Sequence, residues 1–158
     1  HLRALDHKKL WALVQPRLKA EGIQTPEDFA WVDRALGVFK TSMETLNDAI
    51  ALFKPIDDRF FTIHDDGKEA LSWETSAKVL TAWKKGLEAA PEYLTSEDFE
   101  RLQNSIKDSC SVKGKQLFMP IRVAVIGQPH GAELKNLVPL IHRSSLMERA
   151  EKCLNFRP

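Results

Sequence analysis

The sequence has no long hydrophobic run, few cysteines and no signal for export. None of its apolar stretches reaches the ~18 residues that a membrane-spanning helix requires, and the opening letters HLRALDHKK lack the hydrophobic region of a signal peptide. Its two cysteines, Cys110 and Cys153, form no CxxC pair, and such a distant pair is typical of reduced, buried thiols. We therefore expect a cytoplasmic protein with no membrane span and two inert packing thiols.

Catalytic and cofactor-binding motifs are missing as well. The sequence contains no GxGxxG, no P-loop and no HExxH, and its serines lack the flanking glycines of a nucleophile elbow. The histidines are scattered without the spacing of metal ligands, at positions 1, 7, 64, 130 and 142. The His64-Asp65-Asp66 run is better explained as a polar turn than as an acid–base group. We expect no catalytic residue, cofactor or metal site in this chain.

The charges are unevenly distributed along the sequence. Residues 1–112 contain 15 Lys and Arg against 19 Asp and Glu, a net charge of −4. Residues 113–158 contain 8 against 3, a net charge of +5. A basic region suggests a polyanionic partner such as nucleic acid, although an ordinary solvated surface can also carry a few excess charges.

Helix signals dominate the 158 residues, a length that can bury one sizeable core or two small ones. Caps, prolines and apolar positions three and four residues apart predict the following helices: one from Asp6 to near Gly22, one starting at Thr25-Pro26, one over 41–53, one with Val79–Leu87, one capped by Thr95, one ending at Gly127, one over 134–141 that is bent or ends near Pro139, and a last one capped by Ser145. The pattern breaks between Lys54 and Ser72, which is the best candidate linker. We predict an all-α protein with two small helical units, residues 1–72 and 73–158.

The segment from Gly114 to Gly131, GKQLFMPIRVAVIGQPHG, is the most informative part of the chain. From Leu117 to Gly127 it is almost wholly apolar, and Arg122 is its only charged residue. Burial of an uncompensated guanidinium costs much free energy, so Arg122 must meet a carboxylate, carbonyl oxygens or an anionic ligand. The pattern favours a recognition site, and an internal Arg–carboxylate pair that steadies the fold is the alternative.

This segment resembles the C-terminal anticodon-binding region of bacterial-type glutamyl-tRNA synthetases, whose pattern runs close to GKxLFxPLRxALTGxxxGPEL. Ile126 stands where threonine usually precedes the glycine, and Ala132 stands where proline usually follows the second glycine. Weaker similarity extends over the whole chain, including the segments 1–5 and 10–22. The resemblance implies a helical anticodon-binding cage whose two subdomains are residues 1–72 and 73–158.

The resemblance also implies what the chain belongs to and binds. The family consists of class I ligases that use ATP and magnesium, bound in an upstream catalytic domain, to attach glutamate to its tRNA. The HIGH-like and KMSKS-like motifs of that domain are absent from this sequence. We therefore expect a fragment of such an enzyme, monomeric, with the tRNA(Glu) anticodon stem-loop and its own catalytic domain as partners.

The resemblance assigns roles to particular residues. Arg122 matches the family arginine that contacts the anticodon, and a planar fork of donors suits base acceptors or a phosphate. Ser42 stands where many members have an arginine that helps to distinguish glutamate from glutamine anticodons, and Lys40 could supply the charge instead.

Three further residues flank Arg122: Lys115, Gln128 and His130 could contact phosphates or base edges, or could equally be solvated surface. The tryptophans at positions 11, 31, 73 and 83 have the spacing of core residues, and we interpret them as packing groups. The competing hypothesis for the whole chain is a helical protein–protein interaction domain without an RNA role. A broad apolar surface would favour that alternative, and basic side chains gathered on one face would favour RNA.

Overall fold

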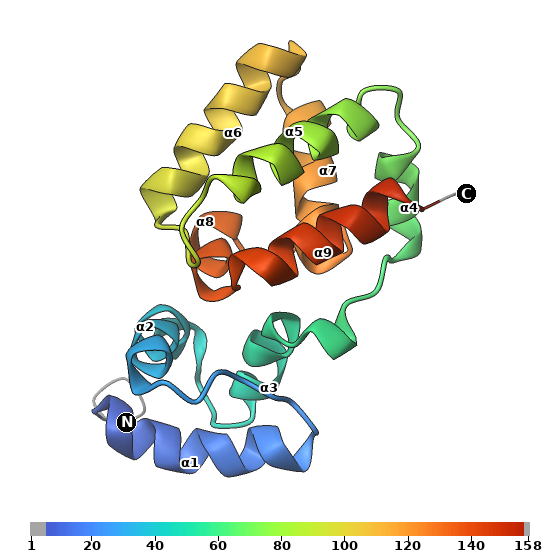
Figure 1. Ribbon diagram of the computed structural model, residues 1–158. Coiled ribbons are helices and arrows are strands. Elements are labelled where there is room, and N and C mark those ends of the chain that lie inside the picture. Colours follow the sequence, from blue (N-terminus) through green and yellow to red (C-terminus); the bar gives the residue numbers. More distant parts are fainter. Residues whose placement is uncertain (1–5, 157–158) are drawn as a thin grey trace. The chain divides into compact units, whose positions relative to one another are not determined.

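The computed structural model describes residues 6–156, and these form nine α-helices joined by short 3₁₀ turns (Figure 1). No strand occurs in the described part of the chain, so the all-α prediction is confirmed. The chain divides into two compact units, His1–Phe60 and Phe61–Pro158. Each unit has its own buried core, and each is described separately below.

The division between the units falls after Phe60, whereas the sequence pattern suggested residue 72. The stretch that we interpreted as a linker contains regular structure on both sides of the division. It contributes the 3₁₀ turns η3 (Lys54–Ile56) and η4 (Asp58–Phe60) to the first unit and α4 (Asp65–Leu71) to the second. These elements are too short to show a helical period, which is why the sequence pattern breaks there.

The first unit contains α1 (His7–Ala20), α2 (Phe29–Phe39), η2 (Lys40–Ser42) and α3 (Asp48–Phe53). As predicted, α1 is capped by Asp6, whose carboxylate accepts a hydrogen bond from the Lys9 N–H at 2.9 Å. Helix α1 packs against α2 and α3.

The core of the first unit is aromatic. The Phe53 ring lies with its centroid 5.7 Å from that of Trp11, 6.1 Å from Trp31 and 4.9 Å from Phe39. Trp31 is buried, as predicted, and so is Trp83 in the second unit. Trp11 and Trp73 are only half-buried, so two of the four tryptophans also form part of the surface.

Two helices of the first unit differ from the prediction. Helix α2 begins at Phe29 rather than at Pro26, because the Asp28 carboxylate accepts from the Ala30 N–H at 3.1 Å and caps it there. The helix expected over 41–53 is confined to Asp48–Phe53. The carboxylate of Asp48 accepts from two preceding backbone N–H groups at 2.8 and 2.9 Å, and this local turn competes with continuation of the helix.

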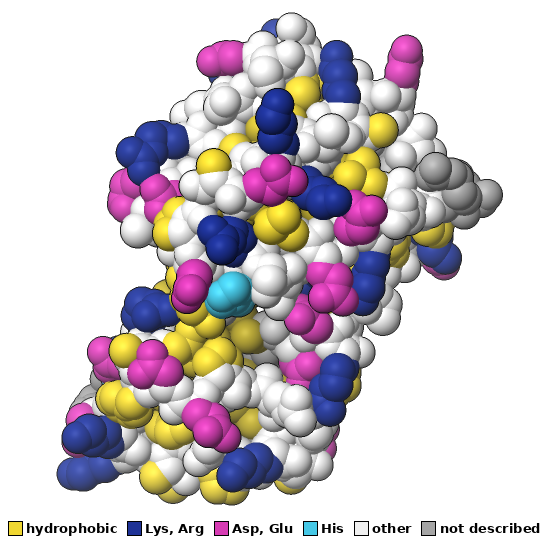
Figure 2. Space-filling model, viewed as in Figure 1, with side chains coloured by type: hydrophobic (Ala, Val, Ile, Leu, Met, Phe, Trp, Pro, Cys, Tyr) yellow, Lys and Arg dark blue, Asp and Glu magenta, His cyan; other side chains and the backbone are white. Residues whose placement is uncertain are grey.

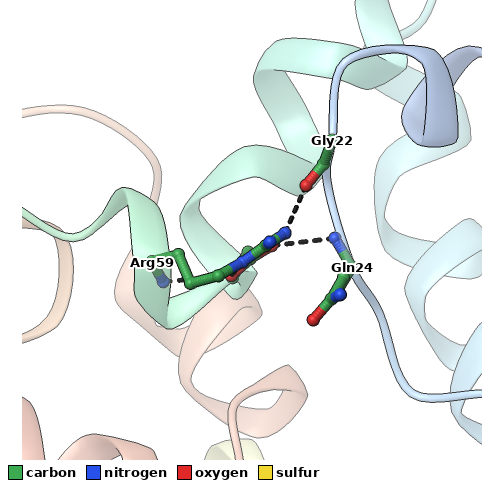
Figure 3. A network of polar contacts seen from close by, with 4 residues as sticks. Gly22, Gln24 and Arg59 are labelled. Carbon is green, nitrogen blue, oxygen red and sulfur yellow. Dashed lines mark hydrogen bonds and ion pairs between the residues drawn. The ribbon is translucent and has the colours of Figure 1, made fainter.

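A buried carboxylate fixes the segment between α1 and α2. Asp57 is buried and accepts hydrogen bonds from the Gln24 N–H at 2.8 Å and from Nη2 of Arg59 at 2.7 Å. Figure 3 shows the Arg59 side chain also reaching the backbone carbonyl of Gly22, to which it donates a hydrogen bond. Burial alone would raise the pKa of Asp57, but the hydrogen bonds from Arg59 and Gln24 outweigh it and lower the pKa below its usual value.

We expect Asp57→Asn to lower the free energy of unfolding of the first unit by about 1–2 kcal/mol at neutral pH, because charge-assisted hydrogen bonds are lost while water already screens the half-exposed Arg59. A lowered pKa in the folded state stabilises the fold above the usual carboxyl pKa of about 3.9, and this contribution is lost as the pH falls through the lowered pKa. Urea unfolding from neutral to strongly acidic pH measures both effects. The difference between wild type and variant should shrink on acidification, and a difference that does not depend on pH would contradict the assignment.

The second unit contains α4, α5 (Ser76–Glu88), α6 (Ser96–Cys110), α7 (Lys115–Ile126), α8 (Leu134–Leu137), η5 (Val138–Leu140) and α9 (Arg143–Leu154). Helix α5 packs along both α7 and α9, and α6 packs on α5 (Figure 1). Trp83 is fully buried between these helices and meets Phe99 edge-on, with ring centroids 5.8 Å apart. The core of this unit therefore lies on the inner faces of α5, α7 and α9.

Most helix ends in the second unit agree with the sequence. Thr95 and Asp98 form the predicted capping box of α6, and Gly127 adopts the predicted left-handed conformation after α7, with φ of 80°. The helix that we expected over 134–141 ends at Leu137 and continues as η5, which contains Pro139. The last helix was predicted to begin at Ser145, but it begins at Arg143, because Nδ1 of His142 accepts from the Ser144 N–H at 3.0 Å.

The two cysteines are buried and unpaired, as predicted. Burial raises the pKa of the Cys153 thiol to about 12. Because the thiolate is the reactive form, Cys153 stays protonated and inert at neutral pH.

Candidate functional site

Helix α7 carries the segment that the sequence singled out, and it has one outward face. Lys115, Phe118 and Arg122 are spaced three and four residues apart, so they lie along one side of the helix. Lys115 and Phe118 are exposed, and Arg122 is half-buried. The expectation that Arg122 is enclosed by hydrocarbon is therefore wrong, because the helical period turns this residue away from the buried face.

Arg122 contacts a backbone carbonyl rather than a carboxylate. Its Nη1 donates to the carbonyl oxygen of Ala132 at 2.9 Å, in the loop that follows α7. Among the residues that the structure describes, no ion pair involves Arg122. The guanidinium is thus steadied by one hydrogen bond and keeps further donors for another acceptor.

The arginine that is fully buried is Arg149 on α9, which the sequence interpretation missed. Only 1% of it is exposed, its Nη1 donates to the Val125 carbonyl oxygen at 2.8 Å, and its guanidinium lies 5.4 Å from the centre of the Phe61 ring. A signal for this burial was present, because Leu146, Ala150 and Cys153 follow the spacing of a buried helix face and Arg149 adjoins it.

A shallow hollow of about 240 Å³ lies beside Arg122. Its lining combines aromatic, amide, basic and acidic side chains: Phe99, Glu100, Gln103, Phe118, Arg122, Glu133, Leu134 and Lys135. Phe118 is 45% exposed, so an aromatic surface and a guanidinium are both accessible at the same place. Such a combination can stack on a planar ring and donate hydrogen bonds to its edge, while Glu100 and Glu133 disfavour a phosphate on their side.

The loop after α7 is anchored to α4 through backbone contacts. The carbonyl of Gly127 accepts from the His64 N–H at 2.8 Å, and a Cβ on Gly67 would lie only 2.6 Å from the same oxygen. His130 is exposed and its Nε2 lies 2.9 Å from a carboxylate oxygen of Asp66. These contacts fix the loop whose Ala132 carbonyl holds Arg122.

The predicted site residues fall into two groups. Lys115, Gln128 and His130 belong to the second unit together with Arg122, on α7 and the loop that follows it. Gln128 is half-buried at the start of this loop.

Lys40 and Ser42 belong to the first unit, on η2. Lys40 is half-buried and lines a hollow of about 410 Å³ with Asp6, His7, Lys8, Phe29 and Asp33, whereas Ser42 is exposed and does not line it. In the same hollow, Nδ1 of His7 lies 2.5 Å from Oδ1 of Asp33.

The uneven charge along the sequence does not follow the division into units. Residues 1–60 contain nine Lys and Arg and nine Asp and Glu, whereas residues 61–158 contain 14 and 13. On the face drawn in Figure 2, basic and acidic side chains alternate over the second unit. Net charge therefore provides little support for an RNA-binding surface.

Within the described residues, no helix is long and apolar enough to cross a membrane.

Comparison with known proteins gives one family and several relatives. The family model described as "Anticodon binding domain" matches residues 9–154. A glutamate–tRNA ligase of Bdellovibrio bacteriovorus is 50% identical over 155 residues, which cover 98% of this chain and 32% of that protein. The chain thus spans about a third of the length of this relative.

Two crystal structures share the fold of this chain. A glutamate tRNA ligase from Elizabethkingia meningosepticum, in complex with its amino acid, matches with a TM-score of 0.80 over 97% of this chain and 30% of that protein. The glutamate-tRNA synthetase of Elizabethkingia anophelis matches with a TM-score of 0.76 over 98% of this chain and 30% of that protein. Both are 11% identical to it, so these matches concern the fold alone.

Proposed function

Because this chain belongs to the anticodon binding domain family, we propose that it is the anticodon-binding module of a glutamate–tRNA ligase, with the anticodon loop of glutamate tRNA as its partner. The observation that carries the proposal is the family match over residues 9–154, together with high identity to a glutamate–tRNA ligase. In the complete protein, the catalytic domain would lie upstream and would bind ATP, magnesium and glutamate. Such a ligase would act in the cytoplasm, where it meets its tRNA.

We propose the hollow beside Arg122 as the place where an anticodon base is read. An anticodon loop presents unstacked bases, whose faces stack on aromatic side chains and whose edges accept hydrogen bonds. Phe118 offers the aromatic surface, and Arg122, which forms no ion pair among the described residues, offers further donors. Lys115 lies two turns before Arg122 on the same face of α7, where it can contact a phosphate of the anticodon loop.

Lys40 and Ser42 on η2 belong to the first unit, apart from the hollow beside Arg122. Ser42 cannot make the bidentate contacts of the arginine that many family members have there, and Lys40 is the nearby cation. We assign to Lys40 the part of anticodon recognition that falls to the first unit.

The direct test of the function is tRNA binding by an Arg122→Ala variant. We expect the variant to bind glutamate tRNA about 10- to 100-fold more weakly than the wild type, because one good side-chain contact to a base is worth about 1–3 kcal/mol. Filter binding at several salt concentrations measures the affinity, which should fall steeply with salt for both proteins because phosphate contacts release counterions.

Arg101→Ala is the matched control, since Arg101 is an exposed arginine of the same unit that does not line the hollow. It should bind tRNA as the wild type does. Circular dichroism checks that Arg122→Ala remains helical; if it does not, Arg122→Lys tests the loss of the fork with the charge retained. Wild-type binding by a folded Arg122 variant would refute the site, and no tRNA binding by the wild type at low salt would refute the function.

A further inference from the structure

A third hollow, of about 720 Å³, lies in the first unit and has no part in the site above. Its volume is within the range of ~300–1,000 Å³ that small-molecule sites occupy. One wall is the face of α1 that carries Trp11, Gln15 and Leu18, which are spaced four and three residues apart. The segment that begins at Gly22 and the side chain of Arg59 complete the lining.

The aromatic part of this hollow is Trp11. Its indole is half-buried and packs on Phe53, with ring centroids 5.7 Å apart and planes inclined by 44°. Trp11 also lines the hollow. A ring held in place on one side and accessible on the other provides a surface for stacking without further ordering.

Two cations, Lys19 and Arg59, line this hollow, and both contact Gly22, Lys19 through its backbone. Nη2 of Arg59 donates to the Gly22 carbonyl, and the Gly22 N–H donates to the Lys19 carbonyl at 3.0 Å. Arg59 is further held by Asp57, through Nε at 3.1 Å and Nη2 at 2.7 Å, so its guanidinium is fixed before any ligand arrives (Figure 3). Nη1 of Arg59 donates no hydrogen bond within the described part of the chain.

The lining of this hollow carries charged and amide side chains. Asp57, which is outside the lining, forms an ion pair with Arg59, and Lys19 is the second cation of the lining. Glu27 is the one carboxylate in the lining. Gln15 and Gln24 add amide groups, which pair with the edges of bases.

We propose that this hollow binds one nucleotide unit, with its base on Trp11 and its phosphate at Arg59 and Lys19. The hollow thus combines a stacking surface, amide groups and an oriented guanidinium, which together match the base and the phosphate of a nucleotide. That the nucleotide belongs to RNA rests on the function proposed above, whereas binding of the nucleotide unit itself does not.

The test uses the full chain labelled with ¹⁵N and titrated with adenosine 5′-monophosphate, inorganic phosphate, or a short single-stranded oligoribonucleotide. We expect the nucleotide to shift the Trp11 indole N–H and the backbone amides of Gly22–Gln24 saturably, and phosphate alone to leave Trp11 unchanged. Tighter binding of the oligoribonucleotide would identify RNA as the source of the nucleotide unit; tighter binding of the free nucleotide would identify a mononucleotide ligand of the same site.

Three variants complete the experiment. Trp11→Leu keeps an apolar group against Phe53 but removes the stacking surface, and should weaken nucleotide binding about tenfold. Lys19→Gln should weaken it several-fold, and Lys9→Gln, an exposed lysine of the same helix outside the hollow, should leave it unchanged.

The absence of a saturable shift at Trp11 with the nucleotide, or equal binding by all three variants, would overturn the proposal. Arg122→Ala should leave this binding unchanged. The tRNA affinity of Arg122→Ala therefore tests the function proposed above, and its nucleotide affinity tests the hollow beside Trp11 independently.

Discussion

Gly127→Ala is expected to destabilise the second unit by about 2–5 kcal/mol. At φ of 80° a side chain costs about 1–2 kcal/mol, and overpacking in a closed space adds about 1–3 kcal/mol. A Cβ on Gly127 would lie 1.7 Å from the carbonyl oxygen of Thr62, so the chain near α4 or the loop after α7 must move. Urea unfolding followed by circular dichroism measures the loss, and faster hydrogen exchange in α7 would locate it.

Gly22→Ala is the matched control for backbone conformation. Gly22 has a similar φ of 74°, but nothing lies within 4 Å of the position of its Cβ. The free energy of unfolding of this variant should fall only by the cost of placing a side chain in the left-handed conformation, about 1–2 kcal/mol. Equal losses in the two variants would mean that the contact between Gly127 and Thr62 is unimportant.

The Gly127→Ala variant should also lose tRNA affinity. The loop after Gly127 supplies the carbonyl of Ala132 that steadies Arg122, and displacement of this loop would release the guanidinium. A positioning role of this kind predicts weaker binding even under conditions in which the variant is fully folded. Unchanged affinity of the folded variant would show that the loop does not orient Arg122.

The second large effect is expected for Arg149→Ala, which should destabilise the second unit by about 3–5 kcal/mol. The substitution leaves a cavity under Phe61 and removes a donor from the Val125 carbonyl in the last turn of α7. The positive guanidinium at this end of α7 also interacts favourably with the helix dipole, and this contribution is lost too. Thermal and urea unfolding measure the change in the free energy of unfolding.

Arg149→Met separates packing from hydrogen bonding. Methionine fills most of the space but leaves the carbonyl of Val125 without this donor, so the expected loss is about 1–3 kcal/mol. If the free energies of unfolding of both Arg149 variants lie within about 0.5 kcal/mol of the wild-type value, the buried guanidinium makes no net contribution to stability.

The local signals in the sequence predicted much of the fold correctly. Asp6, the Thr95–Asp98 capping box and the left-handed Gly127 all act on backbone groups within a few residues, so their effect can be predicted without the rest of the chain. The start of α2 could not be chosen this way, because Thr25 and Asp28 are both capable caps. Asp57, far away in the sequence, holds the segment that precedes α2 and so favours the later start.

The candidate site was predicted in part. The sequence pointed to α7 and to Arg122 as a recognition residue, but it indicated a buried arginine, whereas Arg122 is half-buried on the outward face of the helix. The hollow beside Arg122 combines side chains from α6, α7 and the start of α8, and no local pattern indicates that these segments meet. The same holds for the hollow beside Trp11, whose lining includes Arg59.

The amino-acid sequence by itself determined that this protein is helical, where most of its helices end, and which family its α7 segment resembles. Those properties depend on neighbouring residues and on short motifs. The tertiary structure decided which arginine is buried and which is accessible: Arg149 meets Val125 across 24 positions of sequence, while Arg122 faces outward from its own helix. Burial is a property of segments that come together only on folding, and the chain order alone does not specify those contacts.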